Sequence, residues 1–364
     1  MKLYNKNKSG KIIEWDIEVD NDKYRTITGQ VGGTLITSNW TTCKGKNIGR
    51  SNETTSNQQA LKEVEAKIKK KKEEGYVEDP NLLKDKDGSK QEIVMLAEKY
   101  KDFIDTISFD EILYVQPKLD GIRCKGKNTV LLSRKDKPFV STPHILKELQ
   151  KFHLGESIPL DGELYNHDFK DDFNAIVSIV KKAKPTEKDL QLSEKFMQYH
   201  IYDIQAPGVF STRWKHIQYL FQNFNFKYLK MVPTFAIKKD QVDEYHDKFV
   251  ALGYEGIIIR RDAEYEYFRS KNLLKLKHWM DEEFEIIEIE EGIGNRSGMM
   301  GGIILKTKDG KIFTSNAKGT YDYYKELLIN KNKYIGKMAT LKYQNLTPDG
   351  IPRFGVVIAI RDYE

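Results

Sequence analysis

The chain is poor in cysteine and has no long apolar run. Cys43 and Cys124 are its only cysteines and no CxxC pair occurs, which excludes a disulfide framework and a cysteine-rich zinc site. No apolar stretch approaches the roughly 18 residues of a membrane-spanning helix, and the first residues lack the apolar core of a signal peptide. We therefore expect neither secretion nor membrane insertion. The G-x-x-x-x-G-K-[ST] phosphate loop and the G-x-S-x-G elbow are also missing.

The composition is that of a folded protein with a strongly charged surface. Hydrophobic residues make up 39% of the 364 residues, which is enough to build apolar cores, and charged residues make up 31%. A chain of this length predicts two or three domains. Lysine and arginine exceed aspartate and glutamate by 60 to 54, a net charge of +6. This balance permits a polyanionic partner without requiring one.

Residues 1–80 predict a small β-rich module that closes with one helix. Apolar residues alternate with polar ones along residues 12–20, as in a half-buried strand. After residue 56 the apolar period changes to that of a helix, and Gly75 stands where the C-cap of that helix would be. The module has 15 basic and 12 acidic residues, so it holds half of the net charge of the chain.

The predicted helix carries the basic run KIKKKK, and two interpretations of it stay open. A charge run is usually a solvated face. Alternatively, Lys69, Lys70, Lys71 and Lys72 form a face that contacts the phosphates of a nucleic acid.

The rest of the chain divides near residue 280. Residues 81–280 mix apolar strands with helical stretches and predict an α/β or α+β domain. Residues 281–364 contain about five short strands, including a hairpin across Asp309-Gly310, and predict a small barrel of the OB type. The expected fold class is thus a multi-domain α+β protein.

The first chemical signal is Lys118-Leu119-Asp120-Gly121, directly after a strand that ends in Pro117. A lysine amine attacks as a nucleophile only when it is neutral, and near pH 7 this needs a lowered pKa. Burial beside other cations and a metal would lower it, and Asp120 would orient the amine or hold the metal. The alternative is a solvated lysine at a strand-to-turn boundary.

Later segments add charged residues within apolar strands, where a charge is costly unless it is paired or functional. Lys275 and Lys277 lie two apart on one strand and so face the same side. The other candidates are Asp161 and Glu163 in LDGEL, Glu255 in YEGIIIR, and Arg353 and Arg361 in the last strand segment. Carboxylates for a metal, lysines for phosphate and one reactive lysine together indicate nucleotidyl transfer.

In their order along the chain these segments resemble the ATP-dependent DNA ligases, and especially the small viral ones, of the covalent nucleotidyltransferase superfamily. The resemblance covers about residues 91–364 and rests on KLDGIR, LLSRKDKPF, LDGEL, HIYDI, YEGIIIR, LLKLK and RFGVVIAIR. It implies an ATP-grasp-like adenylyltransferase domain followed by an OB-fold domain. It also implies an enzyme of DNA replication, repair and recombination that seals 5′-phosphate/3′-hydroxyl nicks through a lysyl-AMP intermediate.

The resemblance assigns the reacting groups and their charged neighbours. Lys118 is similar to the lysine that takes AMP. Glu163 is similar to the carboxylate that contacts the ribose or the metal, and Glu255 is similar to the carboxylate that binds the metal. Lys275 and Lys277 are similar to the lysines on the α-phosphate.

The resemblance also assigns contacts with the nucleotide and the nick. Gln116 corresponds to an adenine-edge contact and Tyr202 to the aromatic residue that stacks on adenine, although a core tyrosine is the alternative. Arg123 corresponds to a contact with the nucleotide and the nick, and Arg134 to the arginine that grips the 5′-phosphate. Further phosphate contacts are implied for Arg269, Arg353 and Arg361, the last two on the β- and γ-phosphates.

The implied cofactors are ATP and Mg²⁺, with Mn²⁺ as an alternative, because oxygen ligands and phosphates suit these ions. The implied partner is nicked duplex DNA, with RNA/DNA hybrids left open, and we expect a cytoplasmic monomer of viral or phage origin. Residues 1–80 resemble, outside the Trp-Gly-Arg core itself, the WGR modules of some poly-ADP-ribose polymerases. The alternatives are an RNA ligase, an mRNA-capping guanylyltransferase and a catalytically inactive nucleic-acid-binding adaptor.

Overall fold

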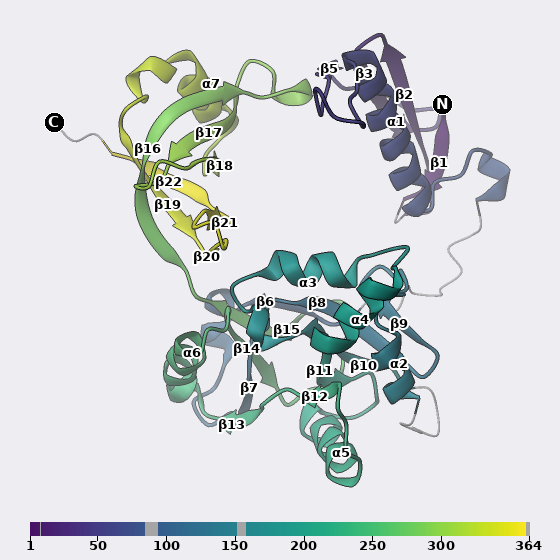
Figure 1. Ribbon diagram of the computed structural model, residues 1–364, viewed down its shortest axis with the longest axis vertical. Coiled ribbons are helices and arrows are strands. Elements are labelled where there is room, and N and C mark those ends of the chain that lie inside the picture. Colours follow the sequence, from purple (N-terminus) through teal and green to yellow (C-terminus); the bar gives the residue numbers. More distant parts are fainter. Residues whose placement is uncertain (8, 84–93, 151–157, 362–364) are drawn as a thin grey trace. The chain divides into compact units, whose positions relative to one another are not determined.

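The computed structural model describes residues 1–7, 9–83, 94–150 and 158–361 (Figure 1). Contacts divide the chain into two compact units. The first comprises Met1–Lys90, Asp281–Lys342 and Gly355–Glu364, and the second, here called the catalytic unit, comprises Gln91–Met280 and Tyr343–Phe354. Within the described ranges, no helix is long and apolar enough to cross a membrane.

The N-terminal module is a sheet of antiparallel strands with one helix packed against it. Its elements are β1 (Leu3–Lys6), β2 (Ile12–Asp20), β3 (Lys23–Gln30), β4 (Leu35–Thr37), β5 (Thr41–Thr42) and α1 (Ser56–Glu73). The strand order is β1-β2-β3-β4, with β5 paired to β3. Trp15 and Ile17 of β2 pack in one core with Ala60 and Val64 of α1. The predicted strand and helix are both confirmed.

Two sheets form the frame of the catalytic unit. One has the order β12-β11-β10-β8-β9 and the other β13-β7-β14-β15-β6. The strands of the first are β8 (Ile122–Lys127), β9 (Val130–Ser133), β10 (Leu160–Tyr165), β11 (Gln198–Ile204) and β12 (Leu229–Met231). Those of the second are β6 (Leu96–Lys99), β7 (Leu113–Pro117), β13 (Phe235–Ile237), β14 (Gly256–Arg261) and β15 (Arg269–Lys277). Pairing is antiparallel except for β11–β12 and β15–β6, so the unit is α+β.

Helices cover these sheets and enclose their cores (Figure 1). Helix α5 packs on β11, α6 packs on β14, and α3 packs on β8 and β10. The helices are α2 (Pro143–Leu149), α3 (Phe173–Val180), α4 (Glu187–Phe196), α5 (Phe210–Asn223) and α6 (Val242–Ala251). Short 3-10 turns lie at Pro80–Leu82, Tyr100–Asp102, Ile104–Thr106, His167–Phe169, Lys239–Gln241, Gly294–Arg296 and Lys331–Lys333.

The C-terminal strands form a closed barrel in the order β16-β17-β18-β22-β19. Its elements are β16 (Met280–Glu291), β17 (Met300–Lys306), β18 (Ile312–Ala317), α7 (Tyr321–Ile329), β19 (Met338–Tyr343) and β22 (Val356–Ile360). The predicted turn at Asp309-Gly310 joins β17 to β18, and Gly310 has the positive φ of 86° that such a turn favours. Strands β20 (Asn345–Leu346) and β21 (Pro352–Arg353) pair with each other and belong to the catalytic unit.

Candidate active site

Lys118 lies where the two sheets of the catalytic unit meet, just after β7. Strand β7 pairs with β14, which brings the Lys118 backbone against Gly256: the Lys118 N–H donates to the Gly256 carbonyl at 2.9 Å. The Glu255 N–H donates to the Lys118 carbonyl at 3.2 Å. The ammonium of Lys118 forms an ion pair with Oε2 of Glu255. Sheet pairing thus places two motifs that are 137 residues apart in direct contact.

A second lysine contacts the other oxygen of Glu255. Strand β15 pairs with β14 so that Lys277 lies opposite Gly256, and its Nζ is 2.6 Å from Oε1 of Glu255. Gly256 has φ 139°, and a Cβ there would lie 2.2 Å from the Leu276 carbonyl oxygen. Only glycine therefore fits between the two motifs. Lys275 is half-buried on the same strand, two residues before Lys277, as the sequence predicts.

Burial and charge shift the pKa values of this cluster in opposite directions. Burial alone would lower the pKa of Lys118, but Glu255, Glu163 and Asp120 outweigh it and raise the pKa above its usual value. For Glu255 the effects are reversed. Burial alone would raise its pKa, but Lys118 and Lys277 hold the pKa below its usual value. Attack by the Lys118 amine requires instead that its pKa be lowered. The carboxylates of the site have the opposite effect until other cations neutralise them.

Glu163 and Lys275 are shifted toward their neutral forms. Burial raises the pKa of Glu163 to about 7, although Lys118 and Arg123 oppose the shift. Burial lowers the pKa of Lys275, and the cations Arg269, Lys277 and Lys118 lower it further. Both groups are therefore more easily switched in charge than they would be in water.

Beside Lys118 is a cavity of about 250 Å³. Five of the ten nucleotide contacts predicted from the sequence lie in its wall, together with residues that no sequence motif indicated. Its lining is Ala97, Gln116, Pro117, Lys118, Leu119, Arg123, Arg134, Glu163, Tyr202, Ile258, Arg260, Leu273 and Lys275. Asp120 and Glu255 line a neighbouring hollow instead.

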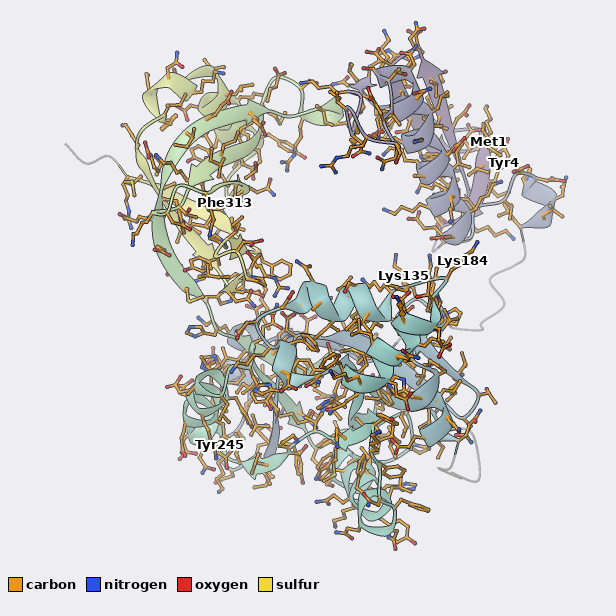
Figure 2. The ribbon with its side chains drawn as sticks, in the orientation of Figure 1. Met1, Tyr4, Lys135, Lys184, Tyr245 and Phe313 are labelled. Atoms are coloured by element: carbon orange, nitrogen blue, oxygen red, sulfur yellow. The ribbon has the colours of Figure 1, made fainter. Side chains whose placement is uncertain are left out.

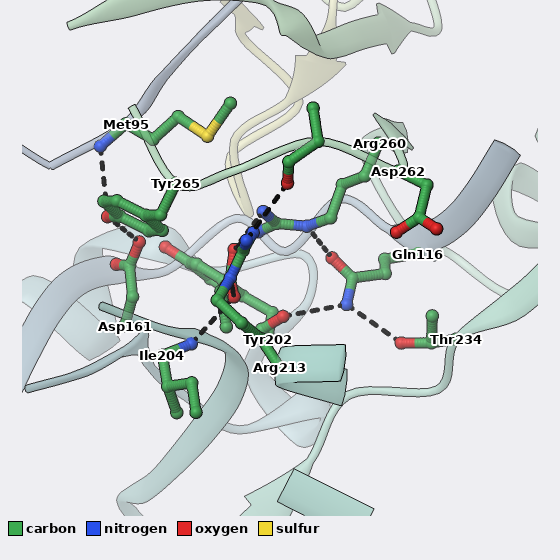
Figure 3. A network of polar contacts seen from close by, with 12 residues as sticks. Met95, Gln116, Asp161, Tyr202, Ile204, Arg213, Thr234, Arg260, Asp262 and Tyr265 are labelled. Atoms are coloured by element: carbon green, nitrogen blue, oxygen red, sulfur yellow. Dashed lines mark hydrogen bonds and ion pairs between the residues drawn. The ribbon is translucent and has the colours of Figure 1, made fainter. Parts of the chain in front are cut away.

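The side chain of Gln116 is almost fully used within the protein (Figure 3). Its Nε2 donates to the Tyr202 carbonyl at 3.1 Å and to Oγ1 of Thr234 at 2.9 Å, and its Oε1 accepts from Nε of Arg260 at 2.8 Å. An amide has two donor hydrogens, and both are engaged here. Any adenine contact would therefore use the remaining lone pair of Oε1, so Gln116 is positioned only as an acceptor.

Arg123 is held in place by the carboxylate of Asp161. Its Nε and Nη2 donate to the two oxygens of Asp161 at 3.0 and 2.6 Å. The Tyr265 hydroxyl donates to Asp161 at 2.7 Å and accepts from the Met95 N–H at 3.1 Å. Asp161 is fully buried, so its role here is to orient Arg123 rather than to face the cavity. Tyr265 had no sequence signal.

A second buried carboxylate binds two arginines, Arg213 and Arg260, which Figure 3 labels. Asp203 binds Arg213, with Nε at 2.8 Å, and also Arg260, with Nη1 at 2.6 Å. Arg260 thus links this ion pair to Gln116 and to the cavity wall. The only sequence signal for Arg260 was an arginine at the end of the apolar run Ile257–Ile259.

The remaining arginines have different surroundings. Arg134 is exposed and lines the cavity. Arg269 is exposed and donates to the Ala97 carbonyl at 2.7 Å. Arg353 binds Asp120, with Nη1 at 2.7 Å, and precedes Phe354, which has a positive φ of 56°. Arg361 bonds to Glu283 and Thr340, which belong to the barrel's unit. Arg361 and Lys118 thus belong to different compact units.

The four consecutive lysines of the N-terminal helix are not equivalent. Lys71 is 4.6 Å from the ring of Tyr76 and pairs with Glu74 at 2.9 Å. Lys72 pairs with Glu78 at 2.5 Å. Lys69 and Lys70 are exposed. The prediction of one uniform phosphate-contacting face therefore applies best to Lys69 and Lys70.

The chain matches family models over most of its length. A model described as "ATP dependent DNA ligase domain" matches residues 94–277, which is half of the chain, and one described as "DNA ligase OB-like domain" matches residues 291–361. These matches favour a DNA ligase over the RNA ligase and guanylyltransferase alternatives.

Similar sequences are DNA ligases of viruses, a bacterium and phages. An African swine fever virus DNA ligase (isolate Malawi Lil 20-1) is 26% identical over 91% of this chain and 81% of its own length. A Haemophilus influenzae DNA ligase is 25% identical over 65% of this chain and 82% of its own length. The viral alignment must include residues well before residue 80, because it covers 91% of the chain.

Solved structures of similar fold include a DNA ligase of the Lig E type. A Lig E DNA ligase aligns with a TM-score of 0.63 and 22% identity, covering 74% of this chain and 98% of its own. At this identity the similarity concerns the fold alone. Together with the family models, these findings mean that the chain belongs to the ATP-dependent DNA ligase family.

Proposed function

We propose that this ligase seals nicks through AMP bound covalently to Lys118. The observation that carries the proposal is the position of Lys118, at the edge of the cavity and between the carboxylates that control its charge. In the first step its amine attacks the α-phosphorus of ATP, and pyrophosphate leaves. In the second step the 5′-phosphate of the nick takes AMP from the lysine. In the third step the 3′-hydroxyl attacks that phosphate, and AMP leaves as the phosphodiester forms.

Lys118 must lose its proton before it attacks, and the ion pair with Glu255 opposes this. We infer that the pair opens when ATP binds, because Glu255 then has other cations to bind. Lys275 and Lys277 lie on the same strand face and are suited to bind the α-phosphate. Each contact that neutralises Glu255 or Glu163 lowers the pKa of Lys118 toward the neutral amine.

The carboxylates fit Mg²⁺ in their chemistry, and Mn²⁺ as an alternative. Mg²⁺ is usually held by one or two carboxylates together with substrate phosphates. Glu163 and Glu255 both act electrostatically on Lys118, as does Asp120. In the described part of the chain, no three acidic, histidine or cysteine side chains converge on one point. Glu163 and Glu255 would therefore hold the ion together with ATP, and it would stabilise charge on the phosphates.

The other residues have binding roles in this proposal. Tyr202 stacks on adenine, and Gln116 accepts from its edge. Arg123 and Arg134 contact the nick, with Arg134 on the 5′-phosphate. Arg269 contacts phosphate. Arg353 and Arg361 act on the β- and γ-phosphates; Arg353 must then exchange Asp120 for a phosphate.

We further propose three domains, residues 1–80, 81–280 and 281–364, with an ATP-grasp-like fold for the second. The N-terminal module would contact DNA through Lys69 and Lys70, and its resemblance to WGR modules stays a prediction. The long viral alignment supports a function for this module in ligation. Deleting residues 1–80 tests it: the slope of log K against log salt for nicked duplex should fall by about 0.9 for each lost phosphate contact.

We propose that the protein acts as a monomer. Viral and phage relatives support action inside a host cell. Acceptance of RNA on either side of the nick stays a prediction, which nicked duplexes with RNA in one strand would test.

The experiment that tests the mechanism separates its steps. Lys118→Ala should take up no AMP from labelled ATP, yet it should seal a nick that already carries AMP, because the last step does not use the lysine as a nucleophile. Labelled AMP that stays covalently attached to this variant would contradict the assignment of Lys118 as the nucleophile. GTP in place of ATP should leave the wild-type protein unlabelled.

A further inference from the structure

A strongly basic surface lies on the catalytic unit beyond the nucleotide cavity. Two segments that are distant in the sequence, residues 134–142 and 181–186, carry six lysines and arginines against one aspartate. Their net charge of +5 in 15 residues nearly equals the +6 of the whole chain. A surface with so little negative charge attracts polyanions.

The two basic segments meet in the fold. The Ser141 hydroxyl donates to the Val180 carbonyl at 2.6 Å, and this bond is buried. Val180 is the last residue of α3, and Lys181 follows it directly. Figure 2 shows Lys135 and Lys184 at the same edge of the catalytic unit. The two segments therefore present their charges on one face.

The first segment is held rigidly before any ligand arrives. The Asp136 N–H donates to the Ser133 carbonyl at 2.9 Å, and the Ser133 N–H donates to the Lys137 carbonyl at 2.8 Å, which closes a tight turn. Lys125 is fully buried, and its ammonium forms an ion pair with Asp136 of this turn. Arg134 and Lys135 are exposed within this turn, so binding orders only their side chains and not their backbone.

Three of the lysines are available to a partner. Lys135, Lys181 and Lys184 are exposed and form no ion pair with the residues that the structure describes. Lys182 differs, because its Nζ pairs with Asp189 at 2.6 Å. The free charges therefore extend outward from Arg134, which lines the cavity beside Lys118.

We propose that Arg134, Lys135, Lys181 and Lys184 form a basic ridge that binds the phosphate backbone of duplex DNA on the 5′-phosphate side of the nick. This inference rests on the proposed function, because Arg134 sets which side of the nick lies against the ridge. The ridge continues the grip on the 5′-phosphate to the next phosphates of the duplex. It reads no bases, since phosphate contacts fix position and carry no sequence information.

The test measures binding of the full chain to a nicked duplex without ATP, over a series of salt concentrations. Lys184→Glu should weaken binding and lower the slope of log K against log salt by about 0.9, the value of one phosphate contact. Lys181→Glu combined with Lys184→Glu should weaken binding on the order of tenfold and lower the slope by about 2. The alanine pair should show the same trend, and equal melting temperatures would show that all variants fold.

Lys215→Glu is the matched control. Lys215 is an exposed helical lysine on α5, which Figure 1 shows at the other end of the catalytic unit from α3. If Lys184→Glu and Lys215→Glu change binding equally, the effect is one of net charge and the ridge is refuted. Binding needs no AMP transfer, so this result stands even if Lys118 proves not to be the nucleophile.

A second pair of substrates tests which side of the nick the ridge holds. The arm on the 5′-phosphate side is shortened by one helical turn, about 10 base pairs, in one duplex, and the other arm is shortened in the second. The wild type should lose affinity mainly when the 5′-phosphate arm is short, and the double variant should not distinguish the two. Loss on the other arm would overturn the proposal.

Discussion

Two carboxylates of the catalytic unit each lie between two cations, yet they have different surroundings. Glu255 lies between Lys118 and Lys277, whose side chains are 20% and 25% exposed. Asp203 lies between Arg213 and Arg260, which are 2% and 4% exposed. Both carboxylates are almost fully buried, so burial of the acid does not separate the two clusters.

The difference lies in the cations and in their access to a ligand. A guanidinium remains charged at any usable pH and holds a carboxylate in a fixed, forked geometry. An ammonium can lose its proton when its surroundings change. The Asp203 cluster is thus suited to hold β11, α5 and β14 together, while the Glu255 cluster can change its charge beside an open cavity. An acid between two cations therefore indicates function only where the cation is a lysine with access to a substrate.

The largest expected effect comes from placing an arginine in the Glu255 cluster, so that it resembles the Asp203 cluster. Lys118→Arg keeps a positive charge beside Glu255, so the protein should remain folded. AMP attachment should be lost completely, because a guanidinium stays protonated and cannot attack phosphorus. Labelling with radioactive ATP measures this, and thermal unfolding checks the fold. Covalent AMP on the variant at a wild-type rate would contradict the role of Lys118.

Removing the acid of the Asp203 cluster should lower the stability of the protein. Asp203→Asn leaves the buried charges of Arg213 and Arg260 without a counterion, and breaking a buried pair in this way costs about 3–5 kcal/mol. Glu255→Gln is the matched change at the other cluster. Its lysines are partly exposed and can gain water when the acid is lost, so the loss of stability there should be smaller than at Asp203.

Chemical denaturation of both variants gives the two values. Equal losses would mean that the two clusters do not differ in the way described above.

Glu163 acts electrostatically on Lys118, so it offers a pH test of the Glu255 cluster. Burial raises its pKa from 4.5 to about 7, so between these values the folded protein binds more protons than the unfolded chain. Stability should therefore fall as pH rises from about 4.5 to about 7, by on the order of 2–3 kcal/mol.

Glu163→Gln should remove this pH dependence from the ATP-free protein. The measurement is the difference in unfolding free energy between the variant and the wild type at a series of pH values. A constant difference across this range would show that Glu163 is charged in the folded state.

Arg134 tests the same comparison with an arginine that has no acidic partner among the described residues. Arg134→Ala should leave stability nearly unchanged, unlike the loss of an Asp203 partner. Transfer of AMP from Lys118 to the nick should slow by roughly 10- to 150-fold, since a lost charge-assisted bond costs about 1.5–3 kcal/mol. Single-turnover transfer and self-labelling are measured side by side. Equal slowing of both steps would place Arg134 on ATP instead.

The sequence alone determined the local elements and the reactive group. Alternation along residues 12–20 and the Asp309-Gly310 turn specified a strand and a hairpin, because the period of side chains and the conformations of glycine are local properties. The motif at Lys118 indicated the nucleophile for a similar reason: only a few residue types support that chemistry. Two lysines spaced two apart on a strand had to share one face.

Only the tertiary structure decided which charges neutralise one another. Lys118 and Glu255 meet because β7 pairs with β14, and such pairing joins residues that no local pattern connects. The same holds for Arg260 on Gln116 and for Tyr265 on Asp161. The raised pKa of Lys118, opposite to what the sequence argument required, also depends on these contacts. Electrostatic energy falls with distance and rises with burial, and neither quantity is present in the order of residues along the chain.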